Sequence, residues 1–555
     1  MNDQSPLSSD VPKAGFAGLP QNWKRDANAG FLVFLIALPL CLGISLACGY
    51  PAIAGVFTAI VGGILCSLLS NSELTIKGPA AGLIVIALGA VTEFGFTAGA
   101  DPAADWRAYR MALGVGVAAG ILQIGFALLR AGALSDFFPT SVVHGMLAAI
   151  GLIIMSKQIH TVLGVRPEAN EPLQLFREIP NSLAHLNPEI TVIGLLGLLL
   201  LFGLPLLKAR WIRAVPAPMW VIATAVPLGL YFGLDHQQTY SFGGHRFDLG
   251  PAYLVNVPAN MFEAIAFPDF SGLQTVAGWK WTIMFALIGS LESLLSAKAI
   301  DLIDPWKRKT NFDRDLLAVG LANVACALIG GLPMISEIVR SKANIDYGAR
   351  TRFADMFHGI FLLLAVALVP GLIHEIPLAA LAAMLVYTGF RLASPREFIH
   401  VYRIGKEQLL IFGATVAGIL ATDLLVGIAI GITLKLLSHV FNGAPLRSLF
   451  RPQITIRREE GGPTVLAVGG SAVFSNWIGL TRRIETAFEA SPHVVIDLSE
   501  TRLVDHTVME RLHTLKREFA ERDGSLTITG LDDHRALAPN PHSARKKSRD
   551  PWFPH

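Results

Sequence analysis

Charged residues are scarce in this chain. Asp, Glu, Lys and Arg make up 16% of its 555 residues, whereas an ordinary soluble protein is about 25% charged. Hydrophobic residues make up 52%, and they lie in long blocks such as Ala29–Gly49 rather than in amphipathic stripes. An apolar run of about 18 residues is long enough to cross a membrane as a helix. The composition therefore excludes secreted, fibrous and disordered proteins and indicates a polytopic α-helical membrane protein.

Cysteine is also rare. The four cysteines, Cys41, Cys48, Cys66 and Cys326, lie in apolar segments without CxxC spacing, which excludes a disulfide framework or zinc site and favours buried free thiols. Walker A and HExxH motifs are absent as well. We therefore expect neither an enzyme nor a cofactor. The formal net charge of +3 is too small to indicate nucleic acid as a partner.

The apolar runs predict about fourteen transmembrane segments, from Ala29–Cys48 to Leu424–Leu437. We assign residues 1–28 to an amino-terminal segment and residues 29–441 to a transmembrane domain. Residues 1–28 are polar, and the first apolar run is as long as a full span, so we expect no cleavable signal peptide. Basic residues gather in alternate loops, which predicts cytoplasmic amino and carboxyl termini in a plasma (inner) membrane.

Two of the segments are too short to span a membrane. The third, Ala80–Ala90, follows Gly78-Pro79, and the tenth, Ile335–Val339, follows Gly330–Pro333. They lie seven apart in the series, and interrupted segments at matching positions of two halves indicate an inverted-repeat transporter with a central site. The alternative is two loops that merely contain Gly and Pro.

These short segments also suggest what the site binds. Helix amino termini carry unpaired N–H groups and the positive end of a dipole. If helices that open at Ala80-Ala81 and at Ser336-Glu337 face each other, the gap between them is an anion site.

Ionisable residues within apolar segments are costly and mark functional sites. Glu292 and Ser296 lie one helical turn apart and could hold a sodium ion or relay a proton, or Glu292 could be neutralised by a neighbouring helix for structural reasons. Arg340 could pair with Glu337 across one turn, or it could extend to the cytoplasmic surface.

After Phe450 the pattern changes to short strands alternating with amphipathic helices, which predicts a small cytoplasmic α/β domain over residues 450–532. Residues 533–555 form a basic tail that we expect to be disordered, either solvated or in contact with anionic lipid.

Several stretches together resemble one family. They are ALPLCLGISLACG in the first apolar run, KGPAAG before the third, ESLLSAK in the eighth, and GLANVACALIGGLPMISEIVRSKANIDYGARTR around the tenth. Near the carboxyl terminus, VVIDLSETRLVDHTVMERL looks like the STAS signature, with matching positions at Asp497, Ser499, Asp505 and Thr507. From about Gly15 to Leu531 the chain resembles the SulP inorganic anion transporters with a carboxyl-terminal STAS domain.

The resemblance implies two seven-segment inverted repeats that form a core and a gate domain, and a homodimer in the membrane lipid. It also implies a role for particular positions. The family's anion-binding positions correspond to Ala80, Ala81, Ser336 and Glu337, with a basic residue of many members at Arg340. Its sodium-binding positions in bicarbonate transporters correspond to Glu292 and Ser296.

Four residues depart from the family pattern. Glu337 stands where members usually have a small or hydroxyl side chain, and Ile338 replaces a threonine of the sodium-coupled members. Both departures favour protons over sodium as the coupling ion. In the STAS signature, Val508 and His506 replace a usual glycine and serine, which favours a packing or dimer role over nucleotide binding or phosphorylation at Thr507.

The sequence thus predicts a secondary active transporter of a small inorganic anion, bicarbonate or sulfate, coupled to a proton or sodium gradient by alternating access. Alternatives within transport are a proton-coupled dicarboxylate carrier, a nucleobase carrier of shared fold and an uncoupled anion channel. From a different class, the chain could be a membrane-anchored sensor with the STAS domain as its output.

Overall fold

The computed structural model describes residues 11–130, 132, 138–169, 171–207, 209, 215–242, 245–258, 260–458, 462–520 and 524–548. Two compact units make up the chain. The first, here called the helical unit, consists of Met1–Gly132 and Ile150–Leu392. The second, the carboxyl-terminal unit, consists of Ala133–Ala149 and Ala393–His555.

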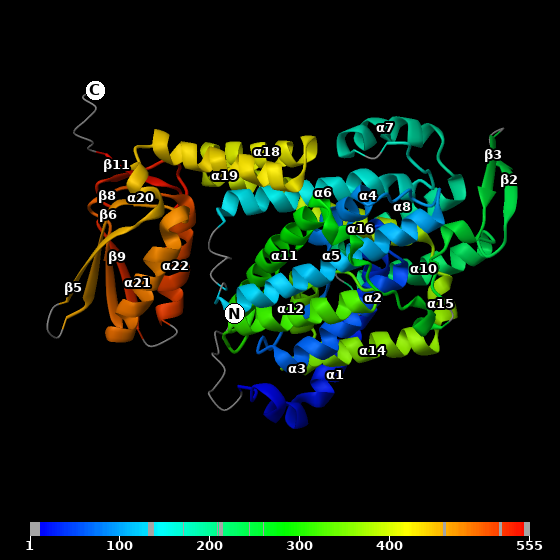
Figure 1. Cartoon of the computed structure of the whole chain (residues 1–555), viewed down its shortest axis with the longest axis horizontal. Helices are drawn as coiled ribbons and strands as arrows, with labels where there is room; N and C mark the ends of the chain where they lie inside the picture. Colours follow the sequence, from blue (N-terminus) through cyan, green and yellow to red (C-terminus); the bar gives the residue numbers. More distant parts are fainter. Residues whose placement is uncertain are drawn as a thin grey trace. The chain divides into compact units, whose positions relative to one another are not determined.

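The helical unit is a bundle of apolar helices in which α5 packs along α12 and α1 along α14 (Figure 1). Its helices are α1 (Leu19–Ala47), α2 (Ala52–Val61), α3 (Ser67–Leu69), α4 (Ile84–Glu93), α5 (Pro102–Leu128), the later part of α6 (Thr140–Val162), α7 (Pro172–Ala184), α8 (Pro188–Gly203), α10 (Ala217–Tyr231), α11 (Val276–Ile303), α12 (Phe312–Leu328), α13 (Ile338–Asp346), α14 (Phe353–Leu368), α15 (Pro370–His374) and α16 (Leu378–Leu392). The first helix begins at Leu19, within the segment expected to precede the first span.

Eight helices of the described residues are long and apolar enough to cross a membrane, and three shorter apolar helices accompany them. The shorter ones are Ala81–Glu93, Ala217–Tyr231 and Phe353–Leu368. This confirms a multi-pass membrane protein. The number fourteen stays a prediction, because several expected segments are helices shorter than a full span.

Short polar side chains fix where the long helices begin. Thr275 Oγ1 accepts from the Gly278 N–H at 3.0 Å at the start of α11, and Asn311 Oδ1 accepts from the Arg314 N–H at 3.0 Å at the start of α12. Such caps satisfy N–H groups that have no partner within the helix.

Two short strands interrupt the bundle. Strand β1 (Ile76–Pro79) pairs antiparallel with β4 (Met334–Glu337), with Lys77 opposite Ser336. Non-helical backbone at membrane depth needs partners for its N–H and C=O groups, which this pairing supplies. The alternative of two loops that merely contain Gly and Pro is therefore wrong, because the stretches before the third and tenth segments pair as strands.

The pairing also corrects the expected helix starts. Gly78-Pro79 belongs to β1, and the first helical turn, the 3-10 turn Ala81–Leu83, leads into α4. Ser336 and Glu337 end β4, and Glu337 is also the N-cap residue of α13, which begins at Ile338. A strand forms in both places because the two segments offer each other hydrogen-bond partners that neither sequence alone contains.

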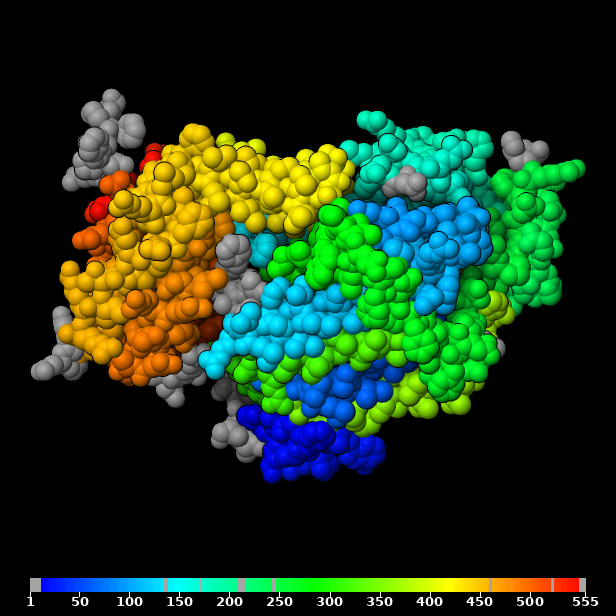
Figure 2. Space-filling view, viewed as in Figure 1, coloured from blue at the N-terminus to red at the C-terminus, as the bar shows by residue number. Residues whose placement is uncertain are grey.

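A β-hairpin precedes α11 and was not expected from the sequence. It consists of β2 (Gln238–Phe242) and β3 (His245–Leu249), which pair antiparallel. Figure 2 shows the hairpin, in green, projecting from the surface of the helical unit.

The carboxyl-terminal unit begins with the first turns of α6 and continues with α17 (Pro395–Ile404), α18 (Lys406–Ala421), α19 (Leu424–Phe441) and α20 (Leu446–Phe450). A seven-stranded sheet follows, in the order β10-β11-β8-β6-β7-β9 with β5 paired to β6. Its strands are β5 (Gln453–Arg458), β6 (Thr464–Ala472), β7 (His493–Asp497), β8 (Thr501–Val504), β9 (Ser525–Thr529), β10 (His534–Ala536) and β11 (Arg545–Lys547).

Helices α21 (Trp477–Ala490) and α22 (His506–Ala520) lie side by side on this sheet (Figure 1), with the rings of Phe488 and Phe519 4.0 Å apart. Apolar side chains of the strands and both helices form one core. The predicted alternation of strands and helices is confirmed, while β8 was missed because four residues carry little periodicity.

The prediction of a disordered tail from residue 533 is wrong for the described residues. Strand β10 pairs with β11, and β11 pairs with β8, with Arg545 opposite Val504. The basic strand β11 thus lies inside the sheet, between β10 at the edge and β8, and its three side chains remain partly exposed. Residues 549–555, including Arg549, lie outside the described residues, as do residues 1–10.

Candidate functional site

The β1–β4 pair brings together most of the side chains predicted to bind an anion. Ala80 and Ala81 follow β1 directly, and Ser336 and Glu337 lie in β4. All four residues belong to the helical unit. Ala80 and Ala81 are buried. Their small side chains leave the backbone N–H groups at the start of this helical segment open to approach, which is the arrangement that favours an anion.

Glu337 reaches across to this helix start. It is the N-cap residue of α13, yet its side chain makes no cap hydrogen bond to its own helix. Its carboxylate lies near the backbone N–H of Ala81. The carboxylate therefore lies where the sequence predicted a bound anion.

Arg340 is buried beside the same strands, with only 1% of its side chain exposed, so its predicted alternative position at the surface is wrong. Its guanidinium donates to the Pro79 carbonyl and, at 3.5 Å, to Cys41 Sγ. Its Nη2 lies 3.9 Å from Glu337 Oε1, which is an ion pair but not a hydrogen bond. Gly78 makes room for this side chain, because a Cβ at Gly78 would lie 2.7 Å from Arg340 Nη1.

Glu292 approaches from α11. Its side chain is buried, and a Cβ at Gly82 would lie 2.2 Å from Glu292 Oε2. The carboxylate thus lies against the backbone of the turn that opens the third segment. Glu292 Oε1 has no hydrogen-bond partner among the residues that the structure describes. Ser296 is also buried, one turn further along α11.

A buried ion pair next to the site escaped the sequence analysis. Lys77 Nζ lies 2.8 Å from Asp315 Oδ1, and both side chains are at most 2% exposed. Ser336 Oγ donates to Asp315 Oδ2 at 3.4 Å and accepts from Ser293 Oγ at 3.1 Å. The Ser336 hydroxyl is thus held in a polar network. The available signal was Lys77 itself, a lysine immediately before Gly-Pro at the start of an apolar segment.

Asn323 of α12 is a second residue that sequence reasoning missed. Its Oδ1 accepts from the Met334 N–H at 2.6 Å, and its Nδ2 donates to the Met334 carbonyl at 3.1 Å and to Gln123 Oε1 at 2.7 Å. One side chain therefore satisfies both backbone groups at the start of β4.

The four predicted STAS positions lie in the carboxyl-terminal unit. Asp497 Oδ1 accepts from the Ser499 N–H at 2.9 Å, which forms a local turn. Thr507 is fully buried, and its hydroxyl accepts from the Thr140 N–H at 3.4 Å. A packing role for Thr507 is consistent with this burial.

Asp505 connects α22 to α19 within the same unit. Its Oδ1 caps α22 by accepting from the Val508 N–H at 2.8 Å, and its Oδ2 lies 3.2 Å from His439 Nε2 and 4.0 Å from Lys435 Nζ. Burial by itself raises the pKa of Asp505, but the Lys435 charge and the contact with His439 outweigh burial and hold this pKa well below its usual value.

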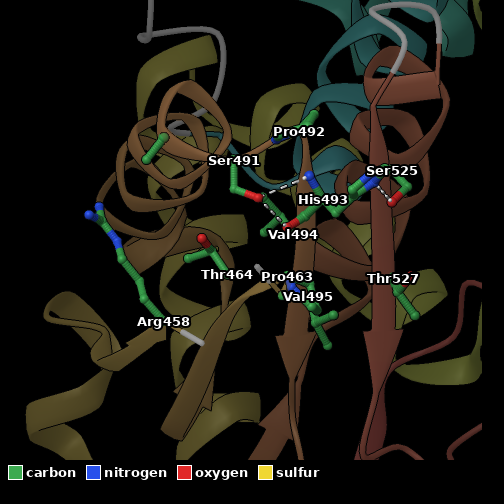
Figure 3. A pocket seen from close by; sticks show the side chains of 12 residues that line it. Arg458, Pro463, Thr464, Ser491, Pro492, His493, Val494, Val495, Ser525 and Thr527 are labelled. Atoms are coloured by element: carbon green, nitrogen blue, oxygen red, sulfur yellow. Dashed lines mark hydrogen bonds between the residues drawn. The ribbon is translucent and has the colours of Figure 1, made fainter. Parts of the chain in front are cut away.

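A groove of about 650 Å³ also opens in the carboxyl-terminal unit, at the amino-terminal ends of β6, β7 and β9 (Figure 3). Its polar side chains largely bond within their own neighbourhood: Ser491 Oγ donates to the His493 carbonyl, and His493 Nδ1 lies 2.9 Å from Ser525 Oγ. The groove lacks the buried, converging charges of the β1–β4 region, so we do not assign the candidate site to it.

Within the described residues, no group of three or more His, Cys, Asp or Glu side chains could hold a metal ion. The candidate site is therefore built from backbone N–H groups, one guanidinium and two carboxylates.

Comparison with known proteins agrees with this architecture. Bacillus subtilis (strain 168) YvdB, which carries the name of a sulfate transporter, is 25% identical, and the match covers 92% of each chain. The bicarbonate transporter BicA of Synechocystis sp. is 22% identical over 92% of this chain and 88% of its own. The murine anion transporter Slc26a9, solved in the inward-facing state, shares the fold with a TM-score of 0.65, at 13% identity over 91% of this chain and 84% of its own.

A match to a sequence profile identifies the family to which the chain belongs. Residues 23–415 match the profile of the Sulfate permease family, which covers most of the chain and includes β1, β4 and every residue of the candidate site. These relatives and the family are transporters, so the expectation of a protein that is not an enzyme is confirmed. The chain is a multi-pass membrane protein and belongs to the Sulfate permease family, as its sequence motifs predicted.

Proposed function

We propose that this protein is a secondary active transporter of small inorganic anions, bicarbonate or sulfate, that works by alternating access. The observation that carries the proposal is the meeting of a helix amino terminus and a buried guanidinium, Arg340, at the β1–β4 pair. The names of YvdB and BicA support sulfate and bicarbonate as the substrates to test.

The anion binds where the backbone is most exposed to it. Ala80 and Ala81 have side chains too small to shield the N–H groups at the start of the third segment, so an oxyanion can reach the Ala81 N–H. Arg340, whose guanidinium donates to the Pro79 carbonyl of β1, adds a positive charge beside this strand. No covalent step is involved, since the substrate crosses the membrane unchanged.

Charge balance calls for a co-transported cation. When both carboxyl groups are ionised, Glu292 and Glu337 bring two negative charges and Arg340 one positive charge, which leaves one negative charge uncompensated before any anion arrives. Adding an anion to such a buried site is costly. A proton or sodium ion at Glu292, next to Ser296, removes that cost, and we propose this pair as the coupling site. The unpartnered Glu292 Oε1 is the atom that would take the cation.

For the whole protein we propose a homodimer in the plasma (inner) membrane with both termini in the cytoplasm, and a STAS domain over residues 450–532 marked by Asp497, Ser499, Asp505 and Thr507. Basic residues in alternate loops support the orientation.

Uptake into proteoliposomes tests the proposal. Labelled bicarbonate, sulfate and succinate are offered under an imposed sodium gradient and, separately, under an imposed proton gradient. We expect gradient-driven uptake of bicarbonate or sulfate, and Glu292→Gln should abolish the stimulation by the cation gradient while the protein still folds. Glu263→Gln, which neutralises an exposed carboxylate in the loop before α11, is the matched control and should transport normally.

Each other outcome contradicts a defined part of the proposal. Uptake of succinate alone would identify a dicarboxylate carrier. Flux that follows voltage without any cation gradient would indicate a channel. No flux of any anion by folded protein would overturn secondary transport and favour a sensor.

A further inference from the structure

The carboxylate of Asp315 contacts both strands of the β1–β4 pair. Its Oδ1 lies 2.8 Å from Lys77 Nζ of β1, and its Oδ2 accepts from Ser336 Oγ of β4 at 3.4 Å. Lys77 and Ser336 lie opposite each other in the strand register, so one side chain of α12 holds a cross-strand pair. Ser70 Oγ, in the segment before β1, donates to the same Oδ1 at 2.5 Å. Asp315 is therefore a common anchor of both strands.

Both donor groups of Ser336 are already in use. Its N–H donates to Ser293 Oγ at 3.1 Å, and its hydroxyl donates to Asp315 Oδ2. The same hydroxyl accepts from Ser293 Oγ at 3.1 Å. A serine hydroxyl has one proton to donate. While that proton points to Asp315, Ser336 can act on the anion site through its position but not as a donor to the anion.

The anchor lies just before the two helix starts. Strand β1 leads into the turn Ala81–Leu83, and β4 leads into α13, which begins at Ile338. A shift of β4 along β1 would therefore change the distance between these starts. Binding groups need to be held within about 0.5 Å of their productive geometry, so the anchor bears directly on anion affinity.

The stability of the fold does not by itself require charges at this place. The Lys77 and Asp315 side chains are both buried. The attraction within a buried ion pair only roughly repays the cost of removing two charges from water, and apolar replacements are often neutral or stabilising. Apolar side chains could fill the same space, but they have no acceptor oxygen to orient the Ser336 hydroxyl. The charges therefore contribute direction.

We propose that Lys77 and Asp315 are positioning residues of the transporter: their ion pair fixes the Ser336 hydroxyl and the register of β4 on β1, and thereby the spacing of the two helix starts at the anion site. This inference rests on the proposed anion-transport function. It changes the expected role of Ser336 from an anion ligand to a part of the anchor. Lys77 and Asp315 act through Ser336 and do not touch the substrate.

The test removes both charges together, so that neither stays buried without its partner. Lys77→Met/Asp315→Asn and Lys77→Met/Asp315→Leu are compared with wild type in proteoliposomes, and bicarbonate and sulfate uptake is measured over a range of concentrations. We expect melting temperatures near that of wild type. The concentration for half-maximal uptake should rise about 10-fold to 100-fold, the worth of one hydrogen bond to a charged group.

The matched control is an exposed ion pair on α13, in which Lys342 Nζ lies 3.1 Å from Asp346 Oδ1. Lys342→Met/Asp346→Asn removes the same two charges from the surface of the helical unit. This variant should match wild type in both melting temperature and half-maximal concentration.

Ser336→Ala separates positioning from direct binding. A hydroxyl that acts through Asp315 loses its effect once the carboxylate is gone, so the two changes are not additive. We therefore expect Ser336→Ala to raise the half-maximal concentration in wild type and to add nothing in Lys77→Met/Asp315→Leu. An equal rise in both backgrounds would overturn the positioning role and identify Ser336 as an anion ligand.

The remaining outcomes distinguish this inference from the proposed function. If wild type transports an anion and the folded charge-free variants keep its half-maximal concentration, positioning is overturned and anion transport stands. If neither charge-free variant folds, the charges serve the fold itself, which also overturns positioning. If folded wild type transports neither bicarbonate nor sulfate, the proposed function fails, and this inference fails with it.

Discussion

At the scale of single residues, the site depends on side chains that are missing as much as on those present. Gly82 has no Cβ, and that space holds the carboxylate of Glu292. Gly78 likewise leaves room for Arg340. A charged group can approach a helix start this closely only where the backbone carries no side chain of its own. The glycines of the KGPAAG stretch are thus part of the binding geometry.

Gly82→Ala tests this dependence. The added methyl group would lie 2.2 Å from Glu292 Oε2, so the carboxylate must move, and we expect anion uptake to fall by about tenfold or more, a loss of about 1.4 kcal/mol. Gly371→Ala is the control, because a Cβ there meets nothing within 4 Å. Combining Gly82→Ala with Glu292→Asp shortens the acid and should restore part of the uptake. Normal uptake by Gly82→Ala would show that Glu292 does not need its observed position.

At the scale of secondary structure, β1 and β4 are held by side chains from neighbouring helices. Asn323 of α12 bonds both backbone groups of Met334, and Ser293 of α11 accepts from the Ser336 N–H at 3.1 Å. The Lys77–Asp315 ion pair ties β1 to α12. These contacts fix the two strands.

In the carboxyl-terminal unit, the contact between α19 and α22 depends on the charge of Asp505. Asp505→Asn keeps an N-cap side chain but leaves Lys435 without its counter-charge, so we expect a loss of about 3–5 kcal/mol in unfolding free energy at pH 7. The titratable neighbours of Asp505 are Lys435 and His439 on α19 and His506 on α22.

The pH dependence of this effect follows from the lowered pKa of Asp505. A carboxyl group with a depressed folded pKa stabilises the fold above its unfolded pKa, and that stabilisation is lost as the pH falls towards the folded pKa. The difference in melting temperature between wild type and Asp505→Asn should therefore be full near pH 7 and shrink below about pH 4. A difference that stays constant down to pH 3 would contradict the charge-based explanation.

At the scale of the whole molecule, the predicted orientation can be tested by labelling. The four natural cysteines are buried, so a maleimide should label an introduced exposed cysteine with little background labelling of the natural ones. Gln237→Cys lies before the β2–β3 hairpin, in the loop between α10 and α11, and Glu500→Cys lies in an exposed turn before β8. We expect an impermeant maleimide to label position 237 in intact cells and position 500 only after permeabilisation. Labelling of both positions in intact cells would contradict a cytoplasmic carboxyl terminus.

The sequence by itself determined the class of this protein, because long apolar runs and scarce charge are stable only in a membrane. Its motifs also determined the family, and its Gly-Pro interruptions located the two segments that meet. Only the tertiary structure decided that these segments pair as strands and that Arg340 is buried. Lys77 with Asp315, Asn323 and the ordered strands β10 and β11 also escaped the sequence. The physical reason is the same in each case. A buried charge or a strand is stable only when it has a partner, and each partner lies on a distant part of the chain.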